Sequence, residues 1–410
     1  MPKEEIIAGL DIGSNKVCCV AGTKDSSSRI VKILAGSTVI SNDGIKAGAV
    51  INIQEASLAI EKVVDEVEKT IGQNVSGAVL AMRGQFIKAL NSKGVASINT
   101  ANREITEETV HSAIESAKKT VRLDPTQEIL QIIPREFILN HQKGIQNPIG
   151  MEATFIEVDA QTFVATSSNV SNIVKAMGEL ECLDKVYGHL AASDAVVTKE
   201  EKELGCLAVD LGGLTTGIAH YCEGIIKFSY ELPVGFDYIT RDIMHRLRAV
   251  SGTAREIKET YGAVFYDPLL EPLEFEYTGA DGNIREYDRA QLVEVVQHRV
   301  DQIIVAIEEV LRKNTPFEEF LSGGIILTGG GARLSKITEA FEKSFNCSCR
   351  LGLPDSSKIV GPAEIINNPV YTTAIGAVNT GFLNEYAMPG SRSSSAGAVG
   401  KIFGWLKDTF

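Results

Sequence analysis

Two segments of the sequence combine an aspartate with a glycine turn, an arrangement that can hold phosphate groups through a metal ion. Asp11 is followed by Gly13, and Asp210 by Gly212, in each case between two apolar runs that predict β-strands. Glycine lets the backbone N–H groups of such a turn approach phosphate oxygens closely. A carboxylate repels a bare polyphosphate, so Asp11 and Asp210 fit a site in which Mg²⁺ and its water molecules lie between them and the phosphates.

The two turns have the same design, which indicates an internal duplication. The first predicted hairpin joins strands at Ile6–Leu10 and Lys16–Ala21, and the second joins strands at Cys206–Val209 and Ile218–Tyr221. Either turn alone is also compatible with an ordinary hairpin, but two of them could hold a triphosphate from both sides. The predicted phosphate-binding residues are Gly13, Ser14, Asn15, Lys16, Gly212, Gly213, Thr215 and Thr216.

A third glycine segment, Gly329–Gly331, follows a predicted strand at Ile325–Leu327. A bare glycine triplet, here Gly329, Gly330 and Gly331, lets a nucleoside lie flat against the backbone, although a loop before a helix can have the same composition. Apolar residues at helical spacing predict helices at 54–71 and 289–312. We expect these strands and helices to position the three glycine segments.

The order of these elements resembles the superfamily of actin, sugar kinases and heat-shock chaperone ATPases. The elements are the Asp11 hairpin, a helix that contains Asp194, the Asp210 hairpin, Gly329–Gly331, and the pair Ala374 and Gly376. Within that superfamily the chain resembles the FtsA family of cell-division proteins, from about residue 5 to residue 384. The matching stretches are Gly44–Gly48, Ile132–Phe137, Gly144–Met151, Lys202–Gly205 and Leu232–Gly235.

The resemblance implies an α/β, actin-like two-domain ATPase fold with an FtsA-type inserted subdomain. The first domain would comprise residues 1–84, 164–195 and 365–385, and the second residues 196–364, with a small subdomain at about 236–300. Residues 85–163 would form the insert. In the insert, Thr106 is the predicted N-cap of a helix, and Ile129–Ile133 and Thr162–Thr166 are predicted strands, with Pro134 at a strand end or a sheet edge.

The same resemblance implies roles for individual residues in a cleft that binds ATP and Mg²⁺. Asp11 and Asp210 would organise the metal ion and its water molecules, and Asp194 could orient an attacking water molecule. Lys258, in a predicted helix at Thr253–Thr260, would lie beside the nucleoside. The alternative for Lys258 is a solvated surface lysine.

Four residues depart from the pattern of the family. Leu214 and Gly217 stand where the second phosphate turn of the family has its third glycine and its final aspartate. Phe236 replaces a common glycine, and Arg255 replaces a common ribose-contacting glutamate. Loss of a glycine restricts close backbone approach, and loss of a carboxylate weakens the organisation of metal and water. The sequence therefore favours ATP binding over fast hydrolysis and leaves open whether the chain is an enzyme.

The segment Gly400–Phe410 predicts an amphipathic helix that follows a flexible linker at 386–399. Its apolar arc holds Ile402, Phe403, Leu406 and Phe410, with Trp405 at one margin. Such a helix suits a lipid interface, and the resemblance implies an anchor on the cytoplasmic side of the plasma membrane, at the division septum. Docking on the body of the protein is the alternative. A helix of about three turns binds lipid weakly, so firm attachment needs many tails on one homopolymer.

Composition bounds the class of protein. The 410 residues carry a net charge of −13, which argues against coating of nucleic acid. No apolar run of about 18 residues predicts a membrane span, and Met1–Glu5 does not begin a secretory signal. The seven cysteines form no C-x-x-C pair and indicate buried free thiols in a reducing compartment.

The resemblance also implies a partner, the C-terminal peptide of the tubulin-like division protein FtsZ. Arg241, Arg246 and Arg248 form a predicted basic cluster for that acidic peptide, unless they are only a solvated helix face. Three alternatives share the fold: a pilus-assembly adaptor, a chaperone ATPase and a small-molecule kinase. The predicted tail is not expected in the first, the second needs a substrate-binding domain, and we identify no substrate base for the third.

Overall fold

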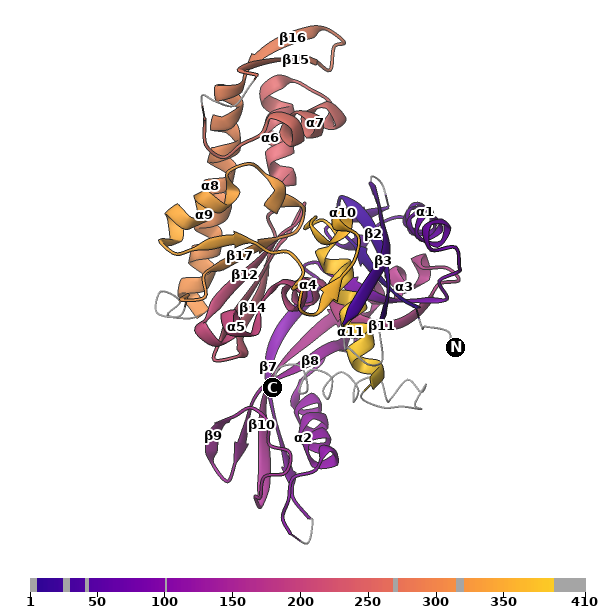
Figure 1. Ribbon diagram of the computed structural model, residues 1–410, viewed down its shortest axis with the longest axis vertical. Coiled ribbons are helices and arrows are strands. Elements are labelled where there is room, and N and C mark those ends of the chain that lie inside the picture. Colours follow the sequence, from indigo (N-terminus) through magenta and orange to yellow (C-terminus); the bar gives the residue numbers. More distant parts are fainter. Residues whose placement is uncertain are drawn as a thin grey trace.

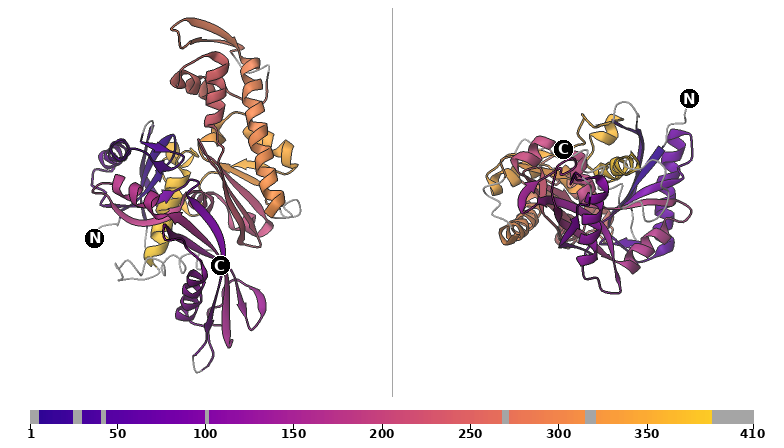
Figure 2. Two further views of the ribbon diagram at one scale, coloured as in Figure 1. Left: turned by 180° about the vertical axis from the view of Figure 1, so that it is seen from behind. Right: turned by 90° about the horizontal axis from the view of Figure 1, so that it is seen from below.

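The computed structural model describes residues 6–386 apart from 25–29, 41–43, 100–101, 268–271 and 315–320. Figure 1 shows a central body with two large sheets and a smaller subdomain projecting from each end, and the views in Figure 2 show the same arrangement. The predicted tail and nearly all of its linker, at 387–410, lie outside the described residues. Within the described part, no helix combines the length and the apolar character that a membrane crossing requires.

The first large sheet has the strand order β11-β6-β1-β2-β3-β19. Its strands are β1 (Ile6–Ile12), β2 (Lys16–Lys24), β3 (Val31–Ile40), β6 (Gly77–Met82), β11 (Glu181–Tyr187) and β19 (Ile359–Val360). The hairpin of β1 and β2 is antiparallel, as predicted, and β6 lies parallel to β1. The associated helices are α1 (Ile53–Ile71), α3 (Ser167–Ala176), α4 (Gly188–Val196), α10 (Ala363–Ile366) and α11 (Thr372–Tyr386), and β4 (Ile45–Lys46) and β5 (Ala49–Val50) form a small ribbon.

Helix α1 is the helix predicted at 54–71, and its sequence explains both its start and its packing. The Asn52 side chain accepts hydrogen bonds from the first N–H groups, and Gly72 ends the helix in the left-handed region at φ 71°. The predicted apolar stripe, including Ala56, Ile60 and Val63, is buried against β2 and β3.

Helix α11 packs unusually close to its neighbours because of two glycines. A Cβ atom on Gly9 of β1 would lie 2.1 Å from the Ala374 carbonyl oxygen, and one on Gly376 would lie 1.9 Å from the Ala191 carbonyl oxygen of α4. Gly376 therefore has a packing role, since any side chain would push α11 away from α4.

The second large sheet repeats the design of the first, in the order β14-β13-β12-β17-β18. Its strands are β12 (Cys206–Leu211), β13 (Thr216–Cys222), β14 (Ile225–Leu232), β17 (Ile325–Thr328) and β18 (Cys349–Leu351). An antiparallel hairpin of β12 and β13 lies beside β17, which is parallel to β12, as β6 is to β1. The shared topology agrees with the internal duplication that the two turns predict. Helices α5 (Lys199–Leu204), α8 (Arg289–Asn314) and α9 (Ile337–Phe345) and the 3₁₀ turn η2 (Gly330–Arg333) accompany this sheet.

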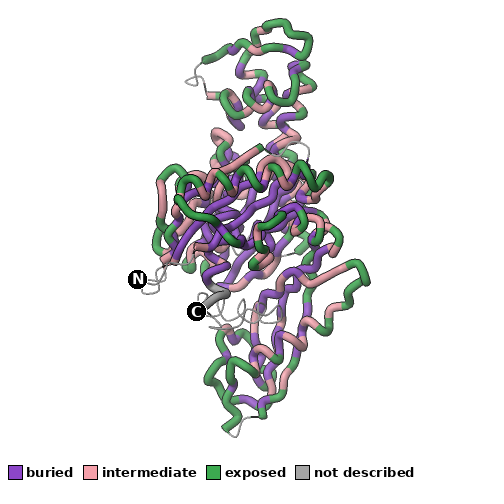
Figure 3. Tube along the Cα trace, turned by 90° about the vertical axis from the view of Figure 1, so that its right-hand side faces the viewer, coloured by how far each residue is buried: buried purple, intermediate pink, exposed green. Residues whose placement is uncertain are grey.

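The subdomain at the top of Figure 1 belongs to the second half of the chain. It contains α6 (Asp237–Leu247), α7 (Ser251–Tyr261) and the hairpin of β15 (Glu274–Thr278) and β16 (Ile284–Asp288). Helix α8 links it to the second sheet, because its 26 residues contact α6 and β16 as well as β14. Figure 3 shows that burial is concentrated in the central body, whereas the ends of both projecting subdomains are largely exposed.

The subdomain at the bottom of Figure 1 is the insert. It consists of a sheet in the order β7-β10-β8-β9, with β7 (Ile87–Ser97), β8 (Gln127–Leu139), β9 (Gln142–Ile145) and β10 (Phe155–Thr166), covered by α2 (Glu107–Thr120). Thr106 caps α2 as predicted. Pro134 lies inside β8 and does not end it. At Pro134 one side of β8 is a sheet edge, because β9 pairs only with Phe137 and Leu139.

The close packing of α11 leads to a stability prediction. Gly376→Ala should lower the free energy of unfolding by about 1–3 kcal/mol, because the added methyl group overlaps the backbone of α4. Chemical denaturation followed by circular dichroism measures the change. Gly252→Ala in α7 is the matched control, since its Cβ atom would meet nothing within 4 Å. An equal loss of stability in both variants would contradict the explanation.

Candidate functional site

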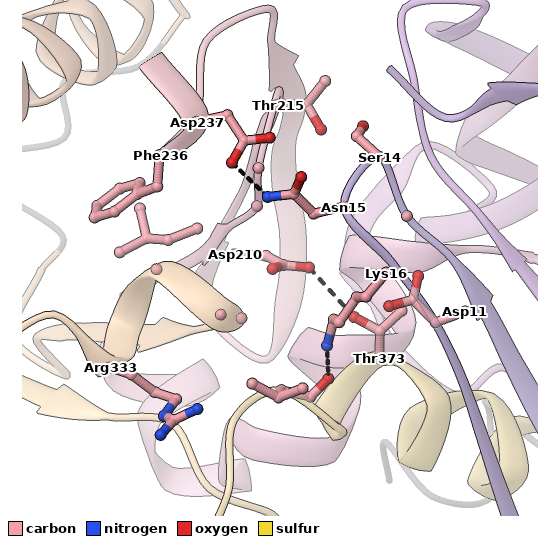
Figure 4. Close-up of a pocket in the computed structure, with 18 of the residues that line it drawn as sticks. Asp11, Ser14, Asn15, Lys16, Asp210, Thr215, Phe236, Asp237, Arg333 and Thr373 are labelled. Atoms are coloured by element: carbon pink, nitrogen blue, oxygen red, sulfur yellow. Dashed lines mark hydrogen bonds between the residues drawn. The ribbon is translucent and has the colours of Figure 1, made fainter. Parts of the chain in front are cut away.

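A cavity of ≈ 330 Å³ lies between the two halves of the central body. Its wall includes thirteen of the residues predicted to bind a nucleotide or metal: Asp11, Gly13, Ser14, Asn15, Lys16, Asp210, Gly212, Gly213, Thr215, Lys258, Gly329, Gly330 and Gly331. Figure 4 shows Asp11, Ser14 and Lys16 facing Asp210 and Thr215 across this space. The fold therefore brings together residues that are about 200 or more positions apart in the sequence.

The two predicted phosphate turns have matching geometry. The Gly13 N–H donates to the Lys16 carbonyl oxygen at 3.0 Å, and the Gly212 N–H donates to the Thr215 carbonyl oxygen at 3.1 Å. The third segment begins with Gly329 at φ 81°, where a Cβ atom would lie 2.3 Å from Asp210 Oδ1. Only glycine tolerates both that backbone conformation and that approach.

Asp11 and Asp210 are 3% and 2% exposed. Each has one buried oxygen, Oδ1, without a hydrogen-bond partner among the described residues. Burial raises the pKa of Asp11, against the effect of the nearby Arg83 and Lys16, and Asp210 raises it further. Such unpartnered carboxylate oxygens fit the oxygen-ligand chemistry of Mg²⁺, held directly or through water.

Charged side chains make the rest of the wall suitable for an anion. The described residues that line the cavity include five cationic side chains and four carboxylates. The cations are Lys16, Arg83, Arg255, Lys258 and Arg333, and the carboxylates are Asp11, Asp210, Asp237 and Glu259. Burial lowers the pKa of Lys16 and of Lys258, because desolvation disfavours the charged form of each amine. Lys258 is half-buried and donates to Thr240 Oγ1 at 2.9 Å, so it is not a freely solvated surface lysine.

Contacts across the cleft hold the two halves together near its mouth. Asn15 Nδ2 donates to Asp237 Oδ1, as Figure 4 shows, and Arg255 Nη2 donates to Asn15 Oδ1 at 3.3 Å. Arg255 therefore contacts the first phosphate turn. These contacts link α6 and α7 of the small subdomain to the β1–β2 turn.

Sequence reasoning missed Arg83, which lies between the two aspartates. Its Nη2 donates to Asp210 Oδ2 and, at 2.9 Å, to Thr373 Oγ1, and its Nε lies 3.9 Å from Asp11 Oδ1. The available signal was its position, because Arg83 directly follows β6, the strand parallel to β1. Side chains at the carboxyl end of adjacent parallel strands share one edge of a sheet.

Two predicted site residues do not line the cavity. Asp194 lies near the far end of α4 and accepts a hydrogen bond from Lys202 Nζ at 2.7 Å. It is the start of α4 that approaches the site, since Gly188 lies next to Arg83. We therefore assign no water-orienting role to Asp194. Thr216 is buried, and its hydroxyl donates to the Val234 carbonyl oxygen at 2.8 Å.

The packing around Gly217 explains one departure from the family pattern. A Cβ atom at this position would lie 2.4 Å from the Cβ atom of His189, so no aspartate fits here. His189 is buried, its Nε2 lies 2.7 Å from Ser229 Oγ, and burial lowers its pKa to about 3. A neutral histidine thus occupies the space next to the cleft in place of a carboxylate.

Comparison with known proteins places the chain among its relatives. A protein from Pseudomonas aeruginosa, named cell division protein FtsA, is 30% identical over 99% of this chain and 98% of its own length. The chain belongs to the FtsA family of cell-division proteins. The FtsA relative from Borreliella burgdorferi is 31% identical over 91% of this chain and 90% of its own length.

Family profiles and solved structures agree with this membership. The profile described as an SHS2 domain inserted in FtsA matches residues 84–164, and the FtsA profile matches residues 207–376. The PilM-PilN type IV pilus biogenesis complex gives a TM-score of 0.66 at 13% identity, covering 92% of this chain and 98% of that chain. MreB5 of Spiroplasma citri bound to ADP gives a TM-score of 0.52 at 14% sequence identity, covering 91% of this chain and 94% of that chain. At these identities the structures show the fold alone, and they confirm the predicted actin-like fold. The SHS2 profile confirms the FtsA-type insert.

The contact between Gly217 and His189 can be tested by restoring the aspartate of the FtsA family. Gly217→Asp should destabilise the protein by about 1–3 kcal/mol in urea unfolding, because the new side chain overlaps His189. Adding His189→Gly should recover part of that loss, so the two single effects should not add. Leu214→Gly restores the other family residue without such a clash and should lower the free energy of unfolding by at most about 1 kcal/mol. A fully stable Gly217→Asp variant would contradict the packing argument.

Proposed function

We propose that this member of the FtsA family is an ATP-binding, self-assembling protein that tethers FtsZ filaments to the membrane. It would act on the cytoplasmic face of the plasma membrane at the division septum and help to recruit other division proteins. The observation that carries the proposal is the similarity to cell division protein FtsA of Pseudomonas aeruginosa over 99% of the chain. The similarity covers the central body and the insert.

The cavity supports the nucleotide part of the proposal. The two turns at Gly13 and Gly212 would bind phosphate oxygens through backbone N–H groups, and Gly329–Gly331 would contact the nucleoside. Asp11 and Asp210 would hold Mg²⁺ through water, and the metal ion would neutralise part of the phosphate charge. MreB5 of Spiroplasma citri, which shares the fold, is described as bound to ADP. Because Gly217 stands where the FtsA family has an aspartate, we expect binding with slow hydrolysis or none.

The small subdomain supports an acidic partner. Three exposed arginines lie along α6: Arg241 in its middle, Arg246 in its last turn and Arg248 at its C-cap. Arg241 lies over the Tyr238 ring, 4.9 Å from its centroid, and Arg246 Nε donates to the Tyr287 hydroxyl at 3.1 Å. These contacts orient two of the three guanidinium groups at the surface, where they can pair with carboxylates of the FtsZ C-terminal peptide.

The sequence of the tail supports the membrane part of the proposal. Ile402, Phe403, Leu406 and Phe410 supply an apolar arc, and Trp405 is the only tryptophan of the chain. A single short anchor gives weak binding, whereas a polymer presents many anchors at once. The likeness to the pilus protein is one of fold at 13% identity, so a pilus-assembly adaptor is the less supported alternative.

A vesicle assay tests the proposed tether. Trp405 emission should shift to the blue when anionic phospholipid vesicles are added, and Mg-ATP should steepen the titration because assembly adds avidity. A labelled acidic peptide from the FtsZ C-terminus should then co-sediment with the vesicles only when the chain is present. Phe403→Asp should abolish the shift, and Arg246→Glu should keep the shift but lose at least about tenfold in peptide affinity.

The controls separate the parts of the proposal. Arg122→Glu changes an exposed arginine at the opposite end of the molecule and should leave peptide binding unchanged. A blue shift of Trp405 emission that does not respond to Mg-ATP would contradict the proposed coupling between nucleotide binding and assembly. Emission that is already blue in buffer, with no response to vesicles, would show that the tail docks on the protein and would overturn the tether.

A further inference from the structure

Arg83 is a buried cation in the wall of the cleft. Its side chain is 9% exposed and lies between Asp11 of the first domain and Asp210 of the second. Nη2 donates to Asp210 Oδ2 and to Thr373 Oγ1, and an added Cβ atom at Gly212 would lie 3.0 Å from Nη1. One guanidinium thus contacts both a carboxylate and the second phosphate turn.

The surroundings of Arg83 leave three buried polar atoms without partners in the described part of the chain. They are Arg83 Nε, Asp11 Oδ1 and Asp210 Oδ1. Nε lies 3.9 Å from Asp11 Oδ1, too far for a direct hydrogen bond and suitable for a bridging water molecule. Burial opposes the charge on Arg83, but Asp210, Asp11 and Glu231 outweigh it and raise the pKa of the guanidinium. The group is therefore a permanent cation at this position.

This position is the one where two facing aspartates would otherwise need a metal ion. Two carboxylates buried in one cleft repel each other and repel a polyphosphate, and a divalent cation is the usual means of compensation. Arg83 already compensates one of the two negative charges, and its remaining N–H groups can donate to a phosphate oxygen. The planar fork of arginine suits such shared contacts better than the point charge of lysine.

We propose that Arg83 takes over part of the role of the metal ion, so that this chain binds ATP with a weak requirement for a divalent cation. The inference rests on the proposed nucleotide function and specifies how that site is charge-compensated. Lys16 and Arg255, which line the same cavity, would neutralise further phosphate charge in the absence of metal. Arg83 is then a specificity-determining residue for the metal dependence of binding.

Isothermal titration of the full chain with ATP, in Mg²⁺ or in EDTA, tests the inference. The wild type should bind ATP in EDTA within about tenfold of its affinity in Mg²⁺. In EDTA, Arg83→Gln should bind ATP at least about tenfold more weakly than the wild type does. In Mg²⁺ it should recover most of that affinity, because the aspartates are then free to bind metal. Arg83→Lys keeps the charge but not the planar fork of donors. Its ATP affinity in EDTA should lie between those of the wild type and Arg83→Gln.

Arg333→Gln is the matched control. Arg333 is an exposed cation of the same cavity that Figure 4 places away from Asp11, so its loss should weaken binding by the same factor in both buffers. Thermal melting checks that each variant is folded, and the wild-type comparison does not depend on any variant.

The outcomes distinguish this inference from the proposed function. No ATP binding by the wild type in Mg²⁺ would overturn the nucleotide function itself. Binding in Mg²⁺ that disappears in EDTA would overturn the role of Arg83 alone. The same would follow if the affinities of Arg83→Gln and the wild type changed by equal factors between the two buffers.

Discussion

The structure depends on how two buried aspartates of like charge are held at the bottom of one cleft. Asp11 and Asp210 end equivalent strands of two sheets with the same topology, so the duplication that builds the fold also brings these carboxylates together. Their mutual repulsion when buried has to be compensated, and Arg83, Thr373 and Lys16 do so from three different segments of the chain. Arg83 and Thr373 belong to the first half of the body and contact Asp210 of the second, so the same contacts shape the cleft and hold the two halves together.

The same region connects the cleft to the insert. Arg83 contacts Asp210, and the next residue, Gly84, donates its N–H to both oxygens of Glu231 at 3.0 and 3.1 Å. Glu231, on β14, also accepts a hydrogen bond from the Tyr187 hydroxyl at 2.9 Å. A movement of the second sheet towards or away from the first therefore acts directly on the residues from which the insert begins. A nucleotide between the halves would bias that movement in proportion to its differential affinity for the open and closed states.

Local patterns in the sequence predicted the parts of the fold that local forces determine. Apolar runs around a glycine turn predicted both hairpins, and the Thr106 cap predicted the start of α2. The strands of the insert are longer than predicted. Strand β8 continues beyond its first apolar stretch through the half-buried Arg135 and Glu136 to the buried residues 137–139. The contact of Asn15 with Asp237 joins residues 222 positions apart, and the charge pair of Arg83 with Asp210 spans 127. Periodicity carries no information about such pairs, so Arg83 was missed. Asp194 was placed at the cleft from the family resemblance, whereas it is the other end of α4 that lies next to Arg83.

The central claim is that both halves of the chain hold one nucleotide at the same time. Hydrogen–deuterium exchange of the full chain, with and without Mg-ATP, measures this most directly, because bound phosphate protects backbone N–H groups that it accepts from. The account predicts protection at the turns of residues 13–16 and 212–216 and at Gly329–Gly331, with the same dependence on ATP concentration for all three. Protection confined to one turn, or different concentration dependences for the two turns, would contradict it.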